Sequence, residues 1–226
     1  VPIVSEIEVA LAFLPQLRYV AVTGTNGKTT TTALAGHLLR GLGHDAPDAG
    51  NIGTPLSELA LRQHPPAWAA LELSSFQLHD TPGVRPTVGV VTNLSPDHLD
   101  RYPSVEEYYR DKAELFRNAG EKSRWVLNAD DPATLVLHQR LGGAFASRAK
   151  APGATKVFSA AGSLDSDAFF ARERDELVVL GSTIAKRSEF ALFGDHNVAN
   201  ALAALLAVMV ADDAHRTPQA IRRLGE

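Results

Sequence analysis

The chain has 226 residues, enough for one large domain or for one domain with a small appendage. Its 22 basic and 26 acidic side chains give a formal charge of -4, which excludes the strongly basic surface of a general nucleic-acid-binding protein. Cysteine is absent, which excludes disulfides and thiolate chemistry and is in keeping with a reducing cytoplasm. The longest apolar stretch, Ala201–Ala211, is too short for a membrane span. We therefore expect a cytoplasmic protein that binds neither nucleic acid nor membranes.

Short apolar runs alternate with segments of helical periodicity over the first part of the chain. Strands are predicted at Tyr19–Thr23, Trp68–Leu73, Thr87–Thr92 and Arg124–Asn128, and helices at Lys28–Leu42 and Ser104–Ala119. Strands that alternate with helices imply crossover connections and parallel pairing. We therefore expect an α/β fold with a mainly parallel P-loop-type sheet that is flanked by helices.

The pattern changes toward the C-terminal end. Short strand candidates separated by turn residues follow one another at Lys156–Ser159, Asp167–Arg172, Glu176–Leu180 and Glu189–Leu192. They predict a small antiparallel β-sheet, at about residues 155–193, appended to the main domain. A helix from His196 to about Val210 is expected next, with Asp195 as its N-cap, and Thr217-Pro218 predicts the start of a last short helix.

The first expected strand leads into a glycine-rich turn, Thr23-Gly24-Thr25-Asn26-Gly27-Lys28-Thr29-Thr30, that runs into a helix. Glycines let backbone N–H groups approach phosphate oxygens, and the helix N-terminus adds partial positive charge. In such loops the lysine ammonium reaches the outer phosphates and the next hydroxyl holds Mg²⁺. The common spacing would need glycine in place of Val22, so this loop has the shorter form G-x-x-G-K-T. A polyphosphate site is predicted; the alternative is an ordinary glycine turn with a surface lysine.

Polar side chains follow two further strands. Glu72 ends the strand that begins at Trp68, and His98 follows the strand that ends at Thr92. Ligands of open parallel sheets bind beyond the carboxyl ends of the strands, and a carboxylate and an imidazole beside a phosphate loop are plausible Mg²⁺ ligands. The alternative for each residue is an ordinary loop position.

Lys112 lies on the apolar face of the helix expected at Ser104–Ala119, four residues after Tyr108 and three before Leu115. In one interpretation its stem packs on the core and its ammonium extends to water. In the other, its amine enters the cleft near Glu72 and His98, takes up CO₂ and becomes a carbamate, which is an anionic metal ligand. The periodicity leaves both interpretations open.

Asn197 and Asn200 are three residues apart and share one face of the helix that follows Asp195. Two amides in this arrangement can read the donor and acceptor edge of adenine. Equally, they can cap and solvate the first helical turn.

Taken together, these segments resemble the Mur ligases and their folylpolyglutamate synthetase relatives, over essentially the whole chain. The glycine-rich turn looks like the ATP loop of that family, and Glu72–Leu78 looks most like the D-glutamate-adding branch. Further motifs follow in the family's order at Asn51–Gly53, Asn93–Tyr102, Asn128–Asp131 and Gly194–Asn200.

The resemblance implies an ATP-dependent ligase of peptidoglycan precursor synthesis. It would add D-glutamate to UDP-N-acetylmuramoyl-L-alanine through an acyl-phosphate intermediate, using ATP and two Mg²⁺ ions. The alternatives are a folylpolyglutamate synthetase-like ligase and an ATP-binding module without ligase activity.

The resemblance also implies roles for particular residues. Lys28, Lys112 and His98 would be catalytic, with a CO₂-derived carbamate on Lys112. The nucleotide would contact Gly24, Thr25, Asn26, Gly27, Lys28, Thr29, Thr30, Asn197 and Asn200. Metal ligands would be Thr29, Thr30, Glu72, His98 and Lys112, and substrate contacts would be Asn51, Ser74 and Ser75.

Family members have a UDP-binding domain before the ATPase domain and an amino-acid-binding domain after it. The resemblance therefore implies that residues 1–17 are a linker from a missing N-terminal domain and that residues 18–226 are the central ATP-binding domain. The C-terminal domain would be absent, the isolated fragment inactive, and the protein a monomer.

Overall fold

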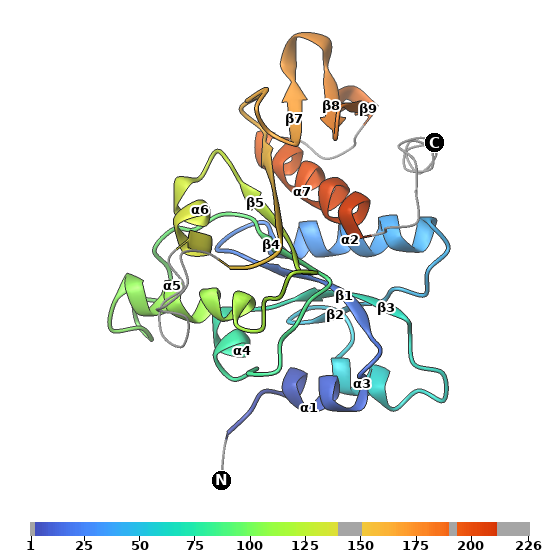
Figure 1. The fold of residues 1–226 in the computed structure, drawn as a ribbon, viewed down its shortest axis with the longest axis vertical. Coiled ribbons are helices and arrows are strands. Elements are labelled where there is room, and N and C mark those ends of the chain that lie inside the picture. Colours follow the sequence, from blue (N-terminus) through green and yellow to red (C-terminus); the bar gives the residue numbers. More distant parts are fainter. Residues whose placement is uncertain (1–2, 140–150, 190–193, 212–226) are drawn as a thin grey trace.

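The described part of the chain, residues 3–139, 151–189 and 194–211 of the computed structural model, is built around one nine-stranded sheet (Figure 1). Its order is β2-β3-β1-β4-β5-β6-β7-β8-β9. Pairing is parallel from β2 to β7, and antiparallel between β7, β8 and β9. The strands are β1 (Arg18–Thr23), β2 (Asp48–Gly50), β3 (Trp68–Glu72), β4 (Val88–Val91), β5 (Arg124–Asn128), β6 (Ala154–Ser159), β7 (Ala168–Ala171), β8 (Glu176–Val179) and β9 (Ser182–Lys186).

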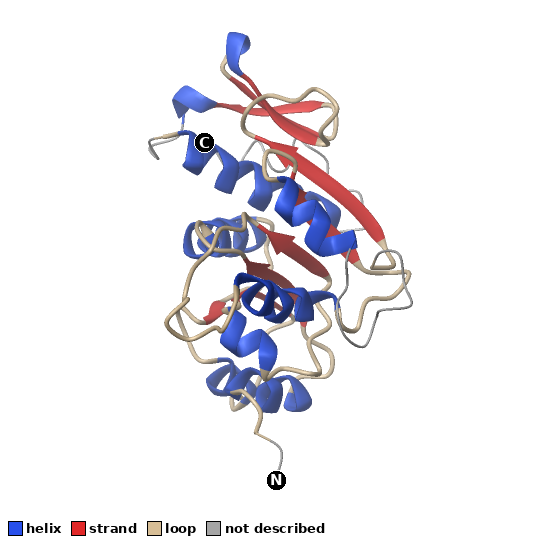
Figure 2. Cartoon of the chain, turned by 90° about the vertical axis from the view of Figure 1, so that its left-hand side faces the viewer, coloured by secondary structure: helices blue, strands red, loops and turns tan. Residues whose placement is uncertain are grey.

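Helices cover both faces of the parallel part of the sheet (Figure 2). They are α1 (Glu6–Phe13), α2 (Lys28–Gly41), α3 (Leu56–Ala60), α4 (Ser75–His79), α5 (Val105–Ala113), α6 (Pro132–Gln139) and α7 (Asp195–Ala211). Short 3₁₀ helices lie at Glu114–Phe116, Arg172–Arg174 and Arg187–Glu189. None of the helices in the described ranges is long and apolar enough to span a bilayer.

Two hydrophobic cores lie on the two faces of the sheet. Alternate residues of one strand enter different cores, as in β1, where Val20 and Val22 face α2 and α7 while Tyr19 and Ala21 face the other layer. That other layer is formed by α1, α3, α4, α5 and α6. Because both faces are covered, the strands are apolar runs without polar alternation, which is why the sequence predicts them well.

The strands predicted at Tyr19–Thr23, Trp68–Leu73, Thr87–Thr92 and Arg124–Asn128 are confirmed within one residue at each end, as β1, β3, β4 and β5. The predicted helices correspond to α2, to α5 with the 3₁₀ turn after it, and to α7. The elements that the sequence did not predict are β2, β9 and the short helices α1, α3, α4 and α6. The segment expected to be a linker contains α1, which Ser5 caps and which buries Ile7 and Ala10.

The appended region differs from its prediction in two respects. Its first strand, β6, pairs in parallel with β5 over five residues, so the region continues the main sheet and is not a separate one. Only β8 and β9 run antiparallel to their neighbours. The hairpin partner of β8 is β9 (Ser182–Lys186), whereas the strand predicted at Glu189–Leu192 starts in a 3₁₀ helix. Its remaining residues, and the helix predicted at Thr217-Pro218, lie outside the described residues.

Candidate active site

The glycine-rich loop follows β1 and ends at the first turn of α2. Gly24 and Gly27 have φ values of 143° and 80°, which L residues rarely adopt. A Cβ atom at Gly24 would overlap the Thr92 hydroxyl, and one at Gly27 would overlap the Asn200 amide oxygen. Both positions therefore require glycine, both for the backbone conformation and for the space around it.

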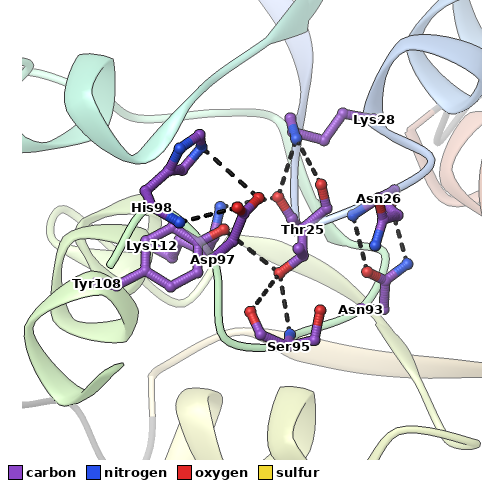
Figure 3. A network of polar contacts seen from close by, with 10 residues as sticks. Thr25, Asn26, Lys28, Asn93, Ser95, Asp97, His98, Tyr108 and Lys112 are labelled. Atoms are coloured by element: carbon purple, nitrogen blue, oxygen red, sulfur yellow. Dashed lines mark hydrogen bonds and ion pairs between the residues drawn. The ribbon is translucent and has the colours of Figure 1, made fainter. Parts of the chain in front are cut away.

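Lys28 folds back over this loop. Its Nζ donates to the carbonyl oxygens of Gly24 at 3.2 Å and Thr25 at 2.9 Å (Figure 3). Burial lowers the pKa of Lys28, while the carboxylates of Glu72 and Asp97 raise it. The ammonium therefore lies over the glycine-rich loop, and its contact with a phosphate stays a prediction.

The residues after β4 brace the loop from the side. The Asn26 N–H donates to the Asn93 side-chain oxygen at 2.8 Å, and the Asn93 amide donates back to the Asn26 carbonyl at 2.9 Å. The Thr92 hydroxyl donates to the same carbonyl at 2.6 Å, and Thr25 exchanges hydrogen bonds with Ser95. The loop conformation is thus held by side chains from the neighbouring strand end (Figure 3).

Glu72 lies at the end of β3 with only 2% of its surface exposed. One carboxylate oxygen accepts from the Thr29 hydroxyl at 2.8 Å, and the other accepts from the Asn51 amide at 2.7 Å. The structure therefore brings together three residues that the sequence assigned to metal and substrate. It also distinguishes the two candidate hydroxyls, because Thr29 is the one that contacts Glu72.

Lys112 of α5 is 1% exposed, and its Nζ donates to the Gly24 carbonyl at 2.7 Å. It also lies 4.5 Å from the centre of the Tyr108 ring. Burial, helped by the positive charge of Lys28 and opposed by Asp97, lowers the pKa of Lys112 to about 7. The interpretation in which the ammonium extends to water is therefore wrong: the amine faces the phosphate loop.

His98 lies in the loop after β4 with an unusual backbone conformation, φ 54°. Its ring contacts Phe76 at 5.4 Å and Tyr108 at 5.9 Å between ring centres, and its Nε2 lies 3.7 Å from an Asp97 oxygen. About half of its side chain is exposed. The imidazole is therefore positioned by aromatic rings at the site and open to a ligand.

Ser74 and Ser75 begin α4. The Ser74 hydroxyl accepts from the Gln77 N–H, and the Gln77 side chain accepts from the Ser74 N–H in return, which forms a capping box. Ser75 is 2% exposed. Ser74 therefore has a structural task in the described fold, and the substrate contact of both serines stays a prediction.

Asn197 and Asn200 lie in the first turns of α7. The Asn200 amide donates to the Asn197 side-chain oxygen at 3.2 Å, and its own oxygen accepts from the Thr31 hydroxyl of α2 at 3.3 Å. Asn200 thus ties α7 to α2, and the adenine contact stays a prediction. Asp195 is not the N-cap: it is the first residue of α7 and pairs with Arg172, while Gly194 supplies the carbonyl for the first helical hydrogen bond.

Sequence reasoning missed Asp97 and Tyr108 as site residues. Asp97 acts electrostatically on both lysines and is hydrogen-bonded to the His98 N–H. Tyr108 is buried between Lys112 and the Thr25 hydroxyl, which lies 3.3 Å from its own. The sequence does carry a signal for Tyr108: it lies four residues before Lys112, so the two side chains share one face of the helix. Asp97 directly precedes His98 in the sequence.

The arrangement has the features of a site for a polyphosphate and its cation. Two lysine amines and a helix N-terminus supply positive charge, and Glu72 with Thr29 offers oxygen ligands. Among the described residues no three His, Cys, Asp or Glu side chains form a metal-binding group. Mg²⁺ in proteins keeps several waters and commonly takes one or two carboxylates together with substrate phosphates.

A family model, the Mur ligase middle domain, matches residues 22–208. The chain belongs to the Mur ligase family. Its curated relatives include UDP-N-acetylmuramoylalanine–D-glutamate ligases from Natranaerobius thermophilus, 35% identical over 92% of this chain and 45% of the relative, and from Solibacter usitatus, 35% identical over 95% and 46%. A third, from Anaeromyxobacter dehalogenans, is 49% identical over 61% of this chain and 29% of the relative.

Two solved structures of ligases and synthases have the same fold. A UDP-N-acetylmuramoyl-L-alanyl-D-glutamate–2,6-diaminopimelate ligase superposes with a TM-score of 0.69 at 25% identity, over 92% of this chain and 45% of its own. Mycobacterium tuberculosis folylpolyglutamate synthase superposes with a TM-score of 0.70 at 16% identity, over 99% and 62%. The chain thus spans less than half the length of the curated relatives described above.

Proposed function

We propose that this chain is the ATP-binding middle domain of a ligase that joins D-glutamate to UDP-N-acetylmuramoyl-L-alanine in peptidoglycan precursor synthesis. The observation that carries the proposal is the convergence of Lys28 and Lys112 on the Gly24 carbonyl, beside the buried Glu72. The relatives with the D-glutamate ligase name support the choice of substrates. The enzyme is proposed to act as a cytoplasmic monomer.

ATP suits the loop because Lys28 presents an ammonium there. The two glycines let the loop take its positive-φ conformation and pack against Thr92 and Asn200. Two Mg²⁺ ions would be held by Thr29, Glu72, His98 and modified Lys112, with Thr30 a further candidate. When bound, they would neutralise phosphate charge and polarise the transferred group. Asn197 and Asn200 would contact adenine, and Asn51, Ser74 and Ser75 would contact the acyl substrate.

The reaction that we propose has two steps. The γ-phosphoryl group passes from ATP to a carboxylate oxygen of the alanyl substrate, which gives an acyl phosphate and ADP. The ammonium of D-glutamate first loses one proton to solvent, and the neutral nitrogen then bonds to the carbonyl carbon. Phosphate leaves and a second proton is released, so the amide keeps one N–H. Bringing a carboxylate to a triphosphate is electrostatically unfavourable, so the fixed positive charge of Lys28 would lower the barrier.

Lys112 is proposed to carry a carbamate. Its nitrogen bonds to the carbon of CO₂ and loses a proton, which replaces a buried amine by an anion at the phosphate loop. The low pKa of about 7 supports this step, because a neutral amine is the form that reacts. The anion would relieve the repulsion between Lys112 and Lys28 and serve as a ligand for the cation.

The test uses a ligase of the relatives' length that contains this chain. We expect ATP, UDP-N-acetylmuramoyl-L-alanine and D-glutamate together to give ADP, phosphate and the amide, and a folate substrate with glutamate to give none. Lys28→Ala should lose about 3 kcal/mol or more of transition-state stabilisation, by analogy with lost oxyanion donors. The control Lys122→Ala changes an exposed lysine before β5 and should retain activity.

Each other outcome contradicts part of the proposal. Amide formation with the folate substrate alone would favour the folylpolyglutamate synthetase-like alternative. ATP binding without carboxylate-dependent ADP release would favour a nucleotide-binding module without ligase activity. Near-normal turnover of Lys28→Ala would overturn the role of that lysine.

A further inference from the structure

The motif Asn128-Ala129-Asp130-Asp131 follows β5 and has no role in the site as described so far. Its first side chain already connects two strand ends: the Asn128 amide donates to the Thr92 carbonyl, at the end of β4, at 2.8 Å. Its last side chain, Asp131, lies at the start of α6. The motif therefore stands beside the segment that leads to His98.

The two carboxylate oxygens of Asp131 have different partners. Oδ1 accepts from the Ala133 N–H at 3.0 Å, which caps the N-terminus of α6. Oδ2 accepts from the Leu94 N–H at 2.6 Å, across from the segment that follows β4. One side chain thus begins a helix and at the same time holds the segment that carries Asp97 and His98.

The position of that segment matters for the site. Leu94 is buried, Ser95 is hydrogen-bonded to Thr25 of the phosphate loop, and His98 has a φ of 54° that non-glycine residues seldom adopt. A conformation of this kind persists where the surrounding contacts over-determine it. The Leu94 N–H, bonded to Asp131, is a contact of this segment that does not involve the phosphate loop.

We infer that Asp131 is a positioning residue of the active site: by holding the Leu94 N–H, it fixes the segment that presents Asp97 and His98 to the phosphate loop. The inference rests on the proposed function where it concerns turnover. It does not require Asp131 to touch ATP, metal or substrate.

Asp130 provides a control from the same turn. Its carboxylate accepts from the Ser159 hydroxyl at 2.6 Å and from the N–H groups of Ala160 and Ala161 at 2.7 and 3.0 Å. It therefore holds the connection between β6 and β7. It has the same charge and a comparable number of hydrogen bonds, but none to the segment that carries His98.

The experiment compares Asp131→Asn, Asp131→Ser and Asp130→Asn in the ligase of family length. Asparagine and serine cap helices about as well as aspartate, so both Asp131 variants keep the start of α6. In Asp131→Asn, the amide oxygen can accept from the Ala133 N–H, and the NH₂ group then faces the Leu94 N–H. Because both of these groups are donors, the hydrogen bond to Leu94 is lost. Serine has a single hydroxyl, so the Leu94 N–H loses its partner if the cap is kept.

We expect hydrogen exchange of the Leu94 amide to be at least tenfold faster in both Asp131 variants than in wild type. In the same variants kcat should fall about tenfold or more, and the Mg²⁺ concentration for half-maximal activity should rise. KM for ATP should change less than twofold. In Asp130→Asn the Leu94 exchange rate, kcat and Mg²⁺ dependence should equal those of wild type.

Unchanged Leu94 exchange in Asp131→Asn would overturn the inference, and so would an equal loss of turnover in Asp130→Asn. Lost turnover with an unchanged Mg²⁺ requirement would point to general destabilisation and would also overturn it. An inactive wild type contradicts the proposed function instead, and the Leu94 exchange still decides whether Asp131 holds the segment.

Discussion

The β1–β4 part of the sheet and its β7–β9 part are built from the same chain but are covered differently. The residues of β3 and β4 are all buried, and β1 is buried except at its first residue. In β7, buried and partly buried residues alternate, and β9 ends exposed. Helices lie on both faces of the first part, whereas hairpin connections join the strands of the second.

This difference accounts for where the site is. Parallel strands joined by crossovers bring their carboxyl ends to one edge, and the phosphate loop, Glu72 and the segment before His98 all follow strands of the first part. Antiparallel neighbours point their ends in opposite directions, so β8 and β9 gather no such set. Where helices cover both faces of the sheet, the loops after the strands are held in place, and polar side chains such as Glu72 and Lys112 can be buried among them.

The largest expected effect is on ATP affinity, and it is tested by replacing one glycine in each part of the molecule. Gly27→Ala places a Cβ against Asn200 in a backbone of φ 80°, and we expect ATP binding at least 100-fold weaker, about 2.7 kcal/mol. Gly181, in the β8–β9 turn, has a φ of 77° with nothing within reach of a Cβ. Gly181→Ala should leave the ATP affinity unchanged in a calorimetric titration, and equal losses in both variants would break the comparison.

A smaller effect concerns the buried lysine. The unfolded Lys112 binds a proton up to its ordinary pKa of 10.5, whereas the folded one loses it near 7. Between these values the unfolded state binds more protons, so the stability contributed by this group rises with pH, by up to about 1.4 kcal/mol per pH unit. The contribution is therefore lost progressively as the pH falls from 10.5 to about 7, and it stays constant below that.

The measurement is denaturant unfolding of the chain in CO₂-free buffer at pH 7 and 9. The stability gain of wild type over this interval should exceed that of Lys112→Met. Lys186→Met, which changes an exposed lysine on β9, should behave as wild type. If the unfolding free energy of Lys112→Met rose between pH 7 and 9 as much as that of wild type, the lowered pKa of the buried Lys112 would be contradicted.

The smallest effect lies in the β7–β9 part. Leu180 and Gly181 form the β8–β9 turn with φ values of 48° and 77°, and left-handed conformations at both positions favour asparagine followed by glycine. Leu180→Asn should therefore raise the unfolding free energy by about 0.5–1 kcal/mol, a gain within the range of relieved backbone strain. Denaturant midpoints measure it, and a destabilised variant would show that the leucine side chain contributes more than its backbone costs.

Local patterns determined much of the fold and of the phosphate loop. The residues of β1, the glycine-rich loop and the start of α2 are contiguous, so the sequence motif alone predicts this unit. Buried parallel strands are recognisable as apolar runs. Short elements such as α3 and α4 span only five residues each and have too little periodicity to detect. The parallel pairing of β6 with β5 is a long-range contact that turn residues do not reveal.

By itself, the sequence determined that a glycine-rich loop with Lys28, two polar residues at strand ends and a lysine on an apolar helix face belong to one Mur-type chain. It did not determine the position of the Lys112 amine, because periodicity predicts which face of the helix a residue occupies but not the direction of a flexible side chain. Only the tertiary structure decided that Lys112 reaches Gly24, that Glu72 meets Thr29 and Asn51, and that Asp131 holds Leu94. Each is a contact between segments far apart in the chain, which exists only once the sheet has brought the strand ends together.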